Sequence, residues 1–307
     1  MDLDELRKEI DNINKEILTL IEKRVGLAKL TASLKKSALS FGREQEVYSS
    51  LQSSVIPKES VRGIFSEIIS ACRKVQREIS VAYLGPEGSF TNIAAIKKFG
   101  SSANLLPLGS FEDVINAVKS RQADYGILPI ENSIEGPVNS TSDLLQDLDS
   151  EIRILSETSL KIVQNLLSDS SNFTKIYSHP QAFAQCRNWI RKNYPNAELI
   201  ETSSTSKAAE TAKAENQAAI ASSYAAQKYD IKTLSENIQD NQNNITRFIV
   251  LGTQNSELTE KNKTSIVFSV KHKAGALFDA LESFKKYNIN LTKMLSQVHK
   301  VTNSLAG

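Results

Sequence analysis

The chain has 307 residues, of which 40% are hydrophobic and 23% are charged. This length accommodates one to three domains, and the composition is that of a soluble globular protein rather than a disordered, collagenous or rod-like chain. The 37 basic and 35 acidic residues leave a net charge of +2, which argues against a dedicated nucleic-acid-binding protein.

Helices are predicted for the first 80 residues. Within residues 3–35, apolar residues recur at alternating steps of three and four, as in an amphipathic helix. They are Leu3, Leu6, Ile10, Ile13, Ile17, Leu20, Leu27 and Leu34. Such a helix extends for about 50 Å and cannot bury its apolar stripe alone, so it needs partner helices or a second chain. Shorter helices are predicted at residues 43–54 and 60–78, with Pro57 between them.

From residue 79 onwards, strands and helices alternate. Residues 79–84 form the first predicted strand, and a turn follows at residues 85–88. The further predicted strands span residues 104–108, 125–130, 152–156, 160–167, 175–178, 198–202, 218–221 and 246–251. The predicted helices lie near residues 90–99, 110–121, 139–148, 180–193 and 205–215. This alternation predicts an α/β fold with largely parallel sheets, in which ligands bind beyond the carboxyl ends of the strands.

A third segment follows a polar linker at residues 253–263. It is predicted to contain a strand at residues 265–270, a helix at residues 275–286 and a strand at residues 289–293. A βαβ segment of this size is too small to form an ordinary two-layer domain by itself. We therefore expect a multidomain chain, with domains at residues 1–79, 80–255 and 263–307.

Few residues suit a metal site or a disulfide. Cys72 and Cys186 have neither the spacing of metal ligands nor the pattern of a disulfide framework. No apolar run reaches the ~18 residues that a membrane span requires, and the acidic, amphipathic first residues are unlike a secretory signal. We expect a cytoplasmic protein with no metal, cofactor, membrane or nucleic-acid partner.

Two cations lie on the apolar side of the long N-terminal helix. The spacing of the stripe falls on Arg24, and Lys35 lies about three turns later and therefore points the same way. Arg7 lies beside the same stripe. Cations on an inward face need an anionic partner, unless they snorkel from the edge of a bundle. A pericyclic rearrangement of a dicarboxylate suits such groups, because it needs charge neutralisation and orientation but neither a nucleophile nor a base.

These residues resemble the all-helical chorismate mutase family over residues 1–80. The matching positions are Leu6-Arg7-Lys8-Glu9-Ile10-Asp11-Asn12-Ile13, Arg24, Lys35 and Arg43-Glu44. The resemblance implies a homodimeric all-α bundle. In it, Arg7 would bind a substrate carboxylate in the site of the second subunit, and Arg24 would bind a carboxylate.

The resemblance implies the other mutase roles as well. Lys35 and Gln76 would contact the ether oxygen from opposite sides. Arg43 and Glu44 would begin the second helix, where Glu44 would face the substrate hydroxyl. Cys72 stands where some members of the family have a serine.

Polar side chains follow several predicted strands of the α/β segment. Residues 129–133 (Pro-Ile-Glu-Asn-Ser) continue an apolar strand, residues 178–181 (Ser-His-Pro-Gln) follow another, and residues 203–206 (Ser-Ser-Thr-Ser) begin a helix. Each string alone is typical of a helix N-cap. At equivalent positions of an α/β fold, the three together indicate one polar, anion-accepting cleft.

The same strings resemble the prephenate dehydratase family over residues 81–252. The matching motifs occur in order: Tyr83-Leu84-Gly85-Pro86, Pro129-Ile130-Glu131-Asn132-Ser133, Ser178-His179-Pro180-Gln181-Ala182 with Gln185-Cys186, Ser204-Thr205-Ser206-Lys207-Ala208-Ala209, and Asn244-Ile245-Thr246-Arg247-Phe248. The resemblance implies two α/β lobes with a cleft between them, as in bilobal ligand-binding proteins, and no cofactor.

The resemblance makes Thr246 the catalytic hydroxyl and Arg247 the group that binds a substrate carboxylate, with Phe248 packed against the substrate ring. The residues implied to line the cleft are Asn132, Ser133, Ser178, Gln185, Ser204 and Thr205. The implied reaction removes carbon dioxide and water from prephenate, and fixed donors suffice because aromatisation drives it. Two alternatives stay open: arogenate as the substrate, and a non-catalytic bilobal sensor of aromatic acids.

The third segment resembles the first half of an ACT regulatory domain. The matching strings are Lys263 to Val270, Gly275-Ala276-Leu277 and Asn290-Leu291-Thr292-Lys293. In that family the Gly-Ala-Leu helix start helps to bind phenylalanine as a feedback inhibitor. A Glu-Ser-Arg-Pro string should follow Thr292-Lys293, but Met294 and Leu295 come next. We therefore expect an incomplete α+β ACT unit, and weak or lost feedback by phenylalanine.

Overall fold

The computed structural model describes residues 1–32, 39–146, 151–255, 262–270 and 273–294. It divides into two compact units, residues 1–260 and residues 261–307. In the described parts of the chain, no helix is long and apolar enough to cross a membrane.

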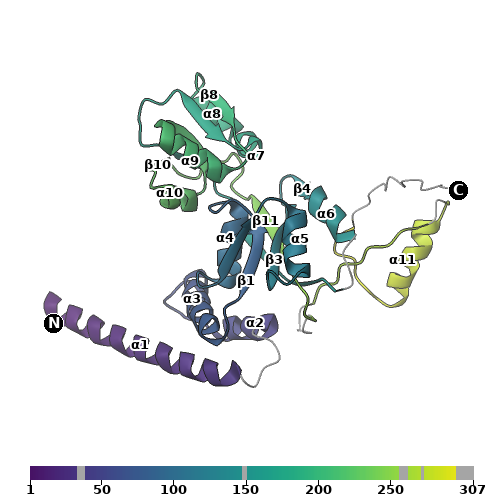
Figure 1. Ribbon diagram of the computed structural model, residues 1–307, viewed down its shortest axis with the longest axis horizontal. Helices are drawn as coiled ribbons and strands as arrows, with labels where there is room; N and C mark the ends of the chain where they lie inside the picture. Colours follow the sequence, from purple (N-terminus) through teal and green to yellow (C-terminus); the bar gives the residue numbers. More distant parts are fainter. Residues whose placement is uncertain (33–38, 147–150, 256–261, 271–272, 295–307) are drawn as a thin grey trace. The chain divides into compact units, whose positions relative to one another are not determined.

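Three helices begin the first unit, as predicted. They are α1 (Leu3–Ala32), α2 (Phe41–Ser50) and α3 (Lys58–Gln76) (Figure 1). Helix α2 begins two residues before the predicted start, because the Ser40 hydroxyl accepts a hydrogen bond from the Arg43 amide and caps it. Lys35, the predicted mutase residue between α1 and α2, lies outside the described residues.

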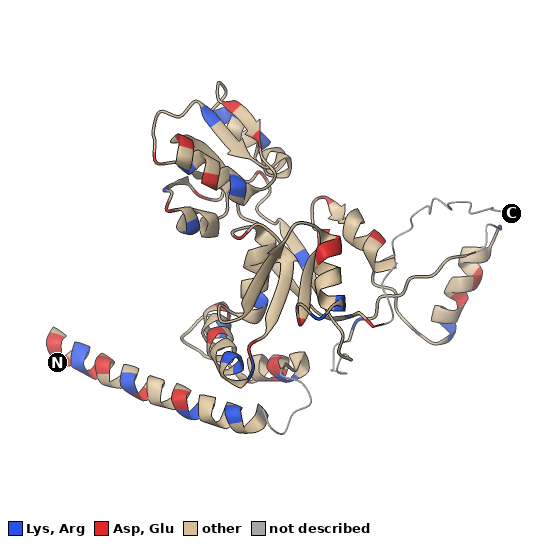
Figure 2. Ribbon diagram, viewed as in Figure 1, with Lys and Arg blue, Asp and Glu red and all other residues tan. Residues whose placement is uncertain are grey.

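Helix α1 packs against α3 but leaves much of its apolar stripe in solvent. Leu6 is 43% exposed, Ile10 56% and Leu20 63%. Basic and acidic residues alternate along the same helix (Figure 2). A stripe of this kind has the pattern of a helix that packs on more than one neighbour.

The first α/β lobe is built on a mixed sheet of six strands. They are β1 (Ser80–Leu84), β2 (Asn104–Leu108), β3 (Tyr125–Asn132), β4 (Gly136–Pro137), β5 (Arg153–Lys161) and β11 (Ile245–Gly252). The order is β2-β1-β3-β11-β5, with β4 paired to β3. Helices α4 (Phe90–Phe99) and α5 (Phe111–Lys119) cover opposite faces (Figure 1), and α6 (Asn139–Gln146) follows β4.

The second lobe has its own five-stranded sheet and its own core. Its strands are β6 (Asn165–Leu167), β7 (Lys175–Ser178), β8 (Glu198–Glu201), β9 (Ala218–Ala221) and β10 (Thr233–Ser235), in the order β10-β6-β9-β7-β8. Its helices are α7 (Pro180–Gln185), α8 (Arg187–Asn193), α9 (Thr205–Glu215) and α10 (Ser223–Tyr229). The chain enters this lobe after β5 and leaves it before β11, so the lobe is an insertion in the first sheet.

Several predictions for these lobes were wrong in detail. Both sheets are mixed rather than largely parallel, because β11 runs antiparallel to β3 and β5, and β6 runs antiparallel to β9 and β10. The strands predicted at 152–156 and 160–167 are instead the long β5 and the short β6. Helix α10 and strand β10 were not predicted.

The helix predicted at 180–193 is broken at Cys186. The cause lies in Asp240, whose carboxylate oxygens accept hydrogen bonds from the Asn188 and Trp189 amides at 3.0 and 3.2 Å. These contacts serve the N-terminus of α8 as a cap would, so a new helix begins there. A residue more than 50 positions away therefore decides the break, and local sequence does not reveal it.

In the second unit, the structure assigns the helix α11 (Ala276–Lys286) and no strand among the described residues. The strands predicted at 265–270 and 289–293 are therefore wrong. A strand persists only where a neighbour completes its hydrogen bonds, and here apolar residues such as Val267 are left 61% exposed. Gly275 begins α11 with a φ of +82°, Ala276 is buried and Leu277 is exposed.

Candidate active sites

A buried polar cluster lies where β3 ends and β11 begins. Asn132, the last residue of β3, is paired in register with Thr246 on the antiparallel β11. The Asn132 Nδ2 donates to the Thr246 Oγ1 at 2.9 Å and to the Asn244 Oδ1 at 2.8 Å. The structure thus brings together two of the predicted dehydratase residues, Asn132 and Thr246, from positions 114 residues apart.

The surroundings of Asn132 determine which way its amide points. Its Oδ1 accepts hydrogen bonds from the Ile134 amide at 2.9 Å and from the Glu135 amide at 3.1 Å. Because that oxygen is occupied by two backbone donors, the Nδ2 group must face Thr246. The Thr246 oxygen therefore accepts from Asn132, and its own hydrogen is available to a different acceptor.

Ser133 and Gln185 extend this cluster. The Ser133 Oγ accepts from the Ile245 amide at 2.9 Å and donates to the Asn243 carbonyl at 3.2 Å. From the second lobe, the Gln185 Nε2 donates to the Glu135 Oε1 at 3.0 Å. A continuous polar network therefore runs from Thr246 across the junction of the two lobes.

The other three residues predicted to line the cleft have contacts within the second lobe. The buried Ser178 donates from its hydroxyl to the Ile220 carbonyl at 2.7 Å. Ser204 caps α9 by accepting from the Lys207 amide at 3.0 Å, and Thr205 is buried at the first position of that helix. These roles are those of strand ends and caps.

A second junction of the lobes forms around Gly88. The Glu87 carboxylate pairs with Lys228, and the Glu87 carbonyl accepts from the Ser206 hydroxyl. The Ser222 hydroxyl donates to the Gly88 carbonyl at 3.4 Å. Gly88 has a φ of +86°, and a Cβ placed there would lie 2.6 Å from the Ser206 Oγ. Only glycine meets both conditions without a shift of the neighbouring lobe.

Arg247 and Phe248 point to opposite faces of β11. Successive side chains of a strand alternate, so Phe248 shares a face with Thr246 and Arg247 lies on the other. The Phe248 side chain is 1% exposed and packs in the core beside α4, on the same face of β11 as Thr246. The Arg247 guanidinium pairs with Glu131 at 2.9 Å and with Glu157 at 3.7 Å.

Among the predicted mutase residues, Arg24 and Gln76 meet at the contact between α1 and α3. The Arg24 Nη1 donates to the Cys72 Sγ at 2.8 Å. The Gln76 Nε2 donates to the Ala28 carbonyl at 2.5 Å and to the Thr31 hydroxyl at 3.2 Å. The pairing of α1 and α3 therefore places the Arg24 guanidinium and the Gln76 amide at the same helix-helix contact.

The other predicted mutase residues lie elsewhere. Arg7 is exposed and pairs with Asp4 of its own helix at 3.4 Å, and Arg43 is exposed and pairs with Glu46 at 2.7 Å. Glu44 is different, because its carboxylate is nearly buried beside Arg73. Side chains at the start of α2 thus face both solvent and the dehydratase lobe.

Sequence reasoning missed three residues at these sites: Asn244, Glu135 and Arg73. Asn244 lies two positions before Thr246, just ahead of β11, and this spacing was a usable signal. Glu135 follows Asn132 by three positions in a turn whose shape the sequence did not predict. Arg73 had no signal, because its partners come from α2 and α4.

Cys186 is not a nucleophile. It is fully buried, and burial raises the pKa of its thiol to about 12. Because the thiolate is the reactive form, this side chain stays inert at neutral pH.

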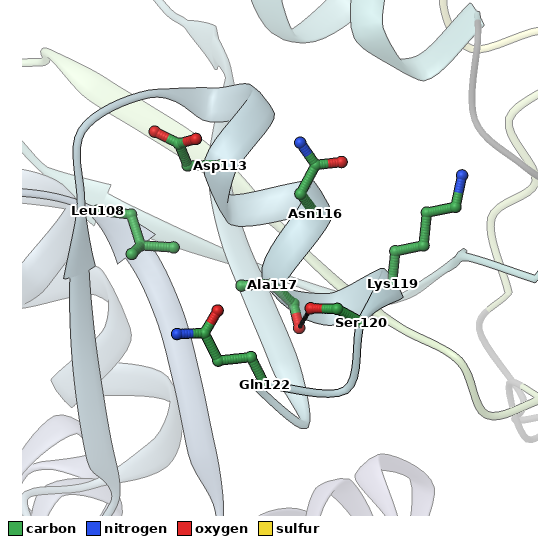
Figure 3. Close-up of a pocket in the computed structure, with 7 residues that line it drawn as sticks. All are labelled: Leu108, Asp113, Asn116, Ala117, Lys119, Ser120 and Gln122. Atoms are coloured by element: carbon green, nitrogen blue, oxygen red, sulfur yellow. Dashed lines mark hydrogen bonds between the residues drawn. The ribbon is translucent and has the colours of Figure 1, made fainter.

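A surface hollow lies beside α5 (Figure 3). Its lining residues are Leu108, Asp113, Asn116, Ala117, Lys119, Ser120 and Gln122. They include none of the predicted site residues, so the hollow is separate from both candidate sites.

Comparison with known proteins assigns the two regions to two families. Residues 81–256 match the prephenate dehydratase family, and residues 6–77 match the type II chorismate mutase family. The bifunctional chorismate mutase/prephenate dehydratase of Aquifex aeolicus is 44% identical over 314 residues, which cover 97% of this chain and 86% of that protein. The protein of the same name from Pseudomonas aeruginosa is 37% identical, with 94% and 83% covered.

The chain belongs to the bifunctional chorismate mutase/prephenate dehydratase family. It therefore carries the mutase and dehydratase activities of phenylalanine biosynthesis, as the sequence predicted. Among solved structures, the prephenate dehydratase of Arthrobacter aurescens in complex with L-Phe is similar, with a TM-score of 0.59 and 29% identity over 68% of this chain and 72% of that one.

Proposed function

We propose that the cluster of Thr246, Asn132 and Asn244 is the catalytic centre for prephenate dehydration. The observation that carries this proposal is the direction of the Asn132 amide, which leaves the Thr246 hydroxyl hydrogen free for an acceptor other than Asn132. The natural acceptor is the ring hydroxyl of prephenate. Donation to that oxygen lets it leave as water while the ring carboxylate leaves as carbon dioxide.

The network around Thr246 contributes preorganisation. A threonine is a weak acid, so its contribution depends on a hydroxyl that is already oriented when the substrate binds. Asn132 supplies this orientation, and Ser133 ties the first residue of β11 to the loop after β3. Gln185 belongs to the same network and comes from the second lobe, so lobe closure would complete the site. Ser178, Ser204 and Thr205 are proposed to line the facing surface.

Arg247 is proposed to bind a substrate carboxylate, and this role requires its present ion pairs to break. Its guanidinium lies on the face of β11 opposite Thr246, so it reaches a shared ligand only by leaving Glu131 and Glu157. An Arg247→Gln variant tests this role. A rise in KM for prephenate supports it, whereas an unchanged KM with lower thermal stability assigns Arg247 to the ion pairs.

For the mutase reaction we propose a site along the seam of α1 and α3. Arg24 would bind a chorismate carboxylate, and Gln76 and Lys35 would stabilise charge on the ether oxygen. The contacts of Arg24 with Cys72 and of Gln76 with Ala28 support this proposal, because they direct both donors into one seam. Arg43 would lie at the start of α2, near the entrance.

We propose that the mutase site is completed by a second copy of the chain. Helix α1 leaves its apolar stripe exposed, and Arg7 at its outer end has only an exposed pair with Asp4. In a homodimer, packing of the stripe would bury it and carry Arg7 to the partner's site. Light scattering tests this, and an active monomer would refute it.

Phenylalanine is proposed to be a weak effector or none. The relative from Arthrobacter aurescens was solved with L-Phe. In this chain Gly275 caps α11 and Ala276 and Leu277 begin it, but the described residues on either side form no strand, and Met294 and Leu295 follow Lys293 in place of Glu-Ser-Arg-Pro. Dehydratase rates with and without phenylalanine test this, and strong inhibition would contradict it.

A coupled assay from chorismate tests the two-site proposal. Thr246→Ala should abolish phenylpyruvate formation and let prephenate accumulate, and Lys35→Ala should stop chorismate consumption but leave dehydration of added prephenate. Loss of both activities in either variant would argue against separate sites. Ligand binding without turnover in the unaltered chain would favour the sensor, and faster turnover of arogenate than of prephenate would reassign the substrate.

A further inference from the structure

A buried ion pair joins the proposed mutase residue Glu44 to the dehydratase lobe. The Arg73 Nη2 lies 2.7 Å from the Glu44 Oε1, and the two side chains are only 6% and 14% exposed. The Arg73 Nη1 donates to the carbonyl of Phe99 at 3.0 Å. Phe99 is the last residue of α4, in the dehydratase lobe, where the negative end of the helix dipole favours a cation.

The start of α2 rests on the same lobe. The ring of Phe41 packs edge-on against Phe99 and Tyr125, with centroids 6.3 and 5.9 Å away. The Lys98 Nζ lies 4.5 Å from the centre of the Phe41 ring. The side chain of Phe41 therefore contacts residues of α4 and β3, while the carboxylate of Glu44 contacts Arg73 of α3.

Two adjacent residues of α3 contact different parts of the molecule. Cys72 accepts from Arg24 on the side of α1, and Arg73 binds Glu44 and the Phe99 carbonyl on the side of the dehydratase lobe. Arg73 therefore links Glu44 directly to the dehydratase lobe, in addition to the contacts of Phe41.

We infer that Arg73 is a positioning residue for the chorismate mutase reaction. It orients Glu44 and is itself bound to the Phe99 carbonyl of the dehydratase lobe. This inference rests on the proposed role of Glu44 toward the substrate hydroxyl. The two carboxylates of the substrate would repel the Glu44 carboxylate, and a fixed cation beside Glu44 offsets this repulsion. Arg73 supplies the cation, and the Phe99 carbonyl fixes its direction.

The test uses the full chain with Arg73→Met, which keeps an unbranched apolar stem and removes the charged guanidinium. We expect mutase kcat/KM to fall by about 10- to 100-fold, as for a misplaced catalytic group, while dehydratase activity stays within about twofold. Lys98, a cation whose pKa Glu44 influences, is left in place.

Arg77→Gln is the matched control. It removes the ion pair with Asp124 at the same junction of α3 and the dehydratase lobe, away from Glu44. Both activities should persist in this variant. If Arg73→Met impairs folding, as lost dehydratase activity would reveal, Arg73→Lys keeps the charge with fewer donors and should give a smaller mutase loss with dehydratase intact.

The double variant separates positioning from general support. Adding Arg73→Met to Glu44→Gln should cause little further loss, because the residue to be positioned is already gone. A full additional loss, or a mutase rate within twofold of wild type in folded Arg73→Met, would overturn the inference. If Glu44→Gln by itself leaves the mutase unchanged, the proposed role of Glu44 fails, and the inference fails with it.

Discussion

The proposed dehydratase site around Thr246 and the proposed mutase site between α1 and α3 differ in how far the contacts of a single chain bury and orient their residues. Around Thr246, Asn132 and Asn244 are buried, and the Asn132 Nδ2 donates to both the Asn244 Oδ1 and the Thr246 Oγ1 within one chain. Along α1, by contrast, the apolar stripe and Arg7 face solvent. In the proposed sites, folding of one chain would be enough to orient the dehydratase cluster, whereas the mutase site would need a second copy to cover its apolar surface.

The largest expected effect comes from breaking the proposed second-copy contact. Ile13→Glu places a charge in the exposed stripe of α1 and should yield a monomer, because burial of an unpaired carboxylate opposes packing. Mutase kcat/KM should fall by roughly 100-fold or more, with dehydration almost unchanged. Light scattering and both assays measure this. Glu16→Gln, elsewhere on the same helix, is the control and should remain dimeric and active. An Ile13→Glu variant that is still dimeric and active would refute the proposed contact between copies.

A smaller loss is expected on the dehydratase side from Asn132→Ala. The Thr246 hydroxyl would lose the donor that orients it, and dehydratase kcat should fall by about 10- to 100-fold. The mutase assay on the same preparation serves as the control for folding. A dehydratase kcat within twofold of wild type would show that Thr246 needs no orientation from Asn132.

The junction between the two regions can be strained at a single glycine. Gly100 has a φ of +81°, and a Cβ there would lie 2.2 Å from the Cβ of Ser70 on α3. Gly100→Ala should lower the free energy of unfolding by about 1–3 kcal/mol. Gly63→Ala on α3, where a Cβ meets nothing within 4 Å, should instead raise it by about 0.5–1 kcal/mol. Denaturant titrations measure both, and equal signs would contradict the structure of this junction.

The smallest effect is a pH dependence from Lys98. Burial lowers the pKa of Lys98 to about 8, against 10.5 for an exposed lysine. Between these values the unfolded chain holds a proton that the folded chain has released, so this lysine's contribution to the free energy of unfolding rises with pH. From pH 8 to pH 10, the free energy of unfolding of the wild type should therefore rise relative to that of Lys98→Met. Parallel stability curves for the two proteins would contradict it.

The local sequence predicted most helices and strands well, because their periodicity is a property of a few neighbouring residues. Helix α4 and strands β2, β7 and β9 lie at their predicted bounds. The break at Cys186 and the missing strands near α11 depend on partners that are far away in sequence or not present beside them. Such partners leave no trace in a window of ten or twenty residues.

By itself, the sequence determined the two-family identity of this protein and supplied the candidate site residues, since the motifs are recognisable from residue types and their order along the chain. Only the tertiary structure decided how those residues meet. It paired Asn132 with Thr246 across 114 positions, turned Arg247 to the opposite face of β11, and joined Glu44 to the dehydratase lobe through Arg73. The physical reason is that hydrogen-bond direction, strand alternation and burial are set by contacts between elements, which no single element contains.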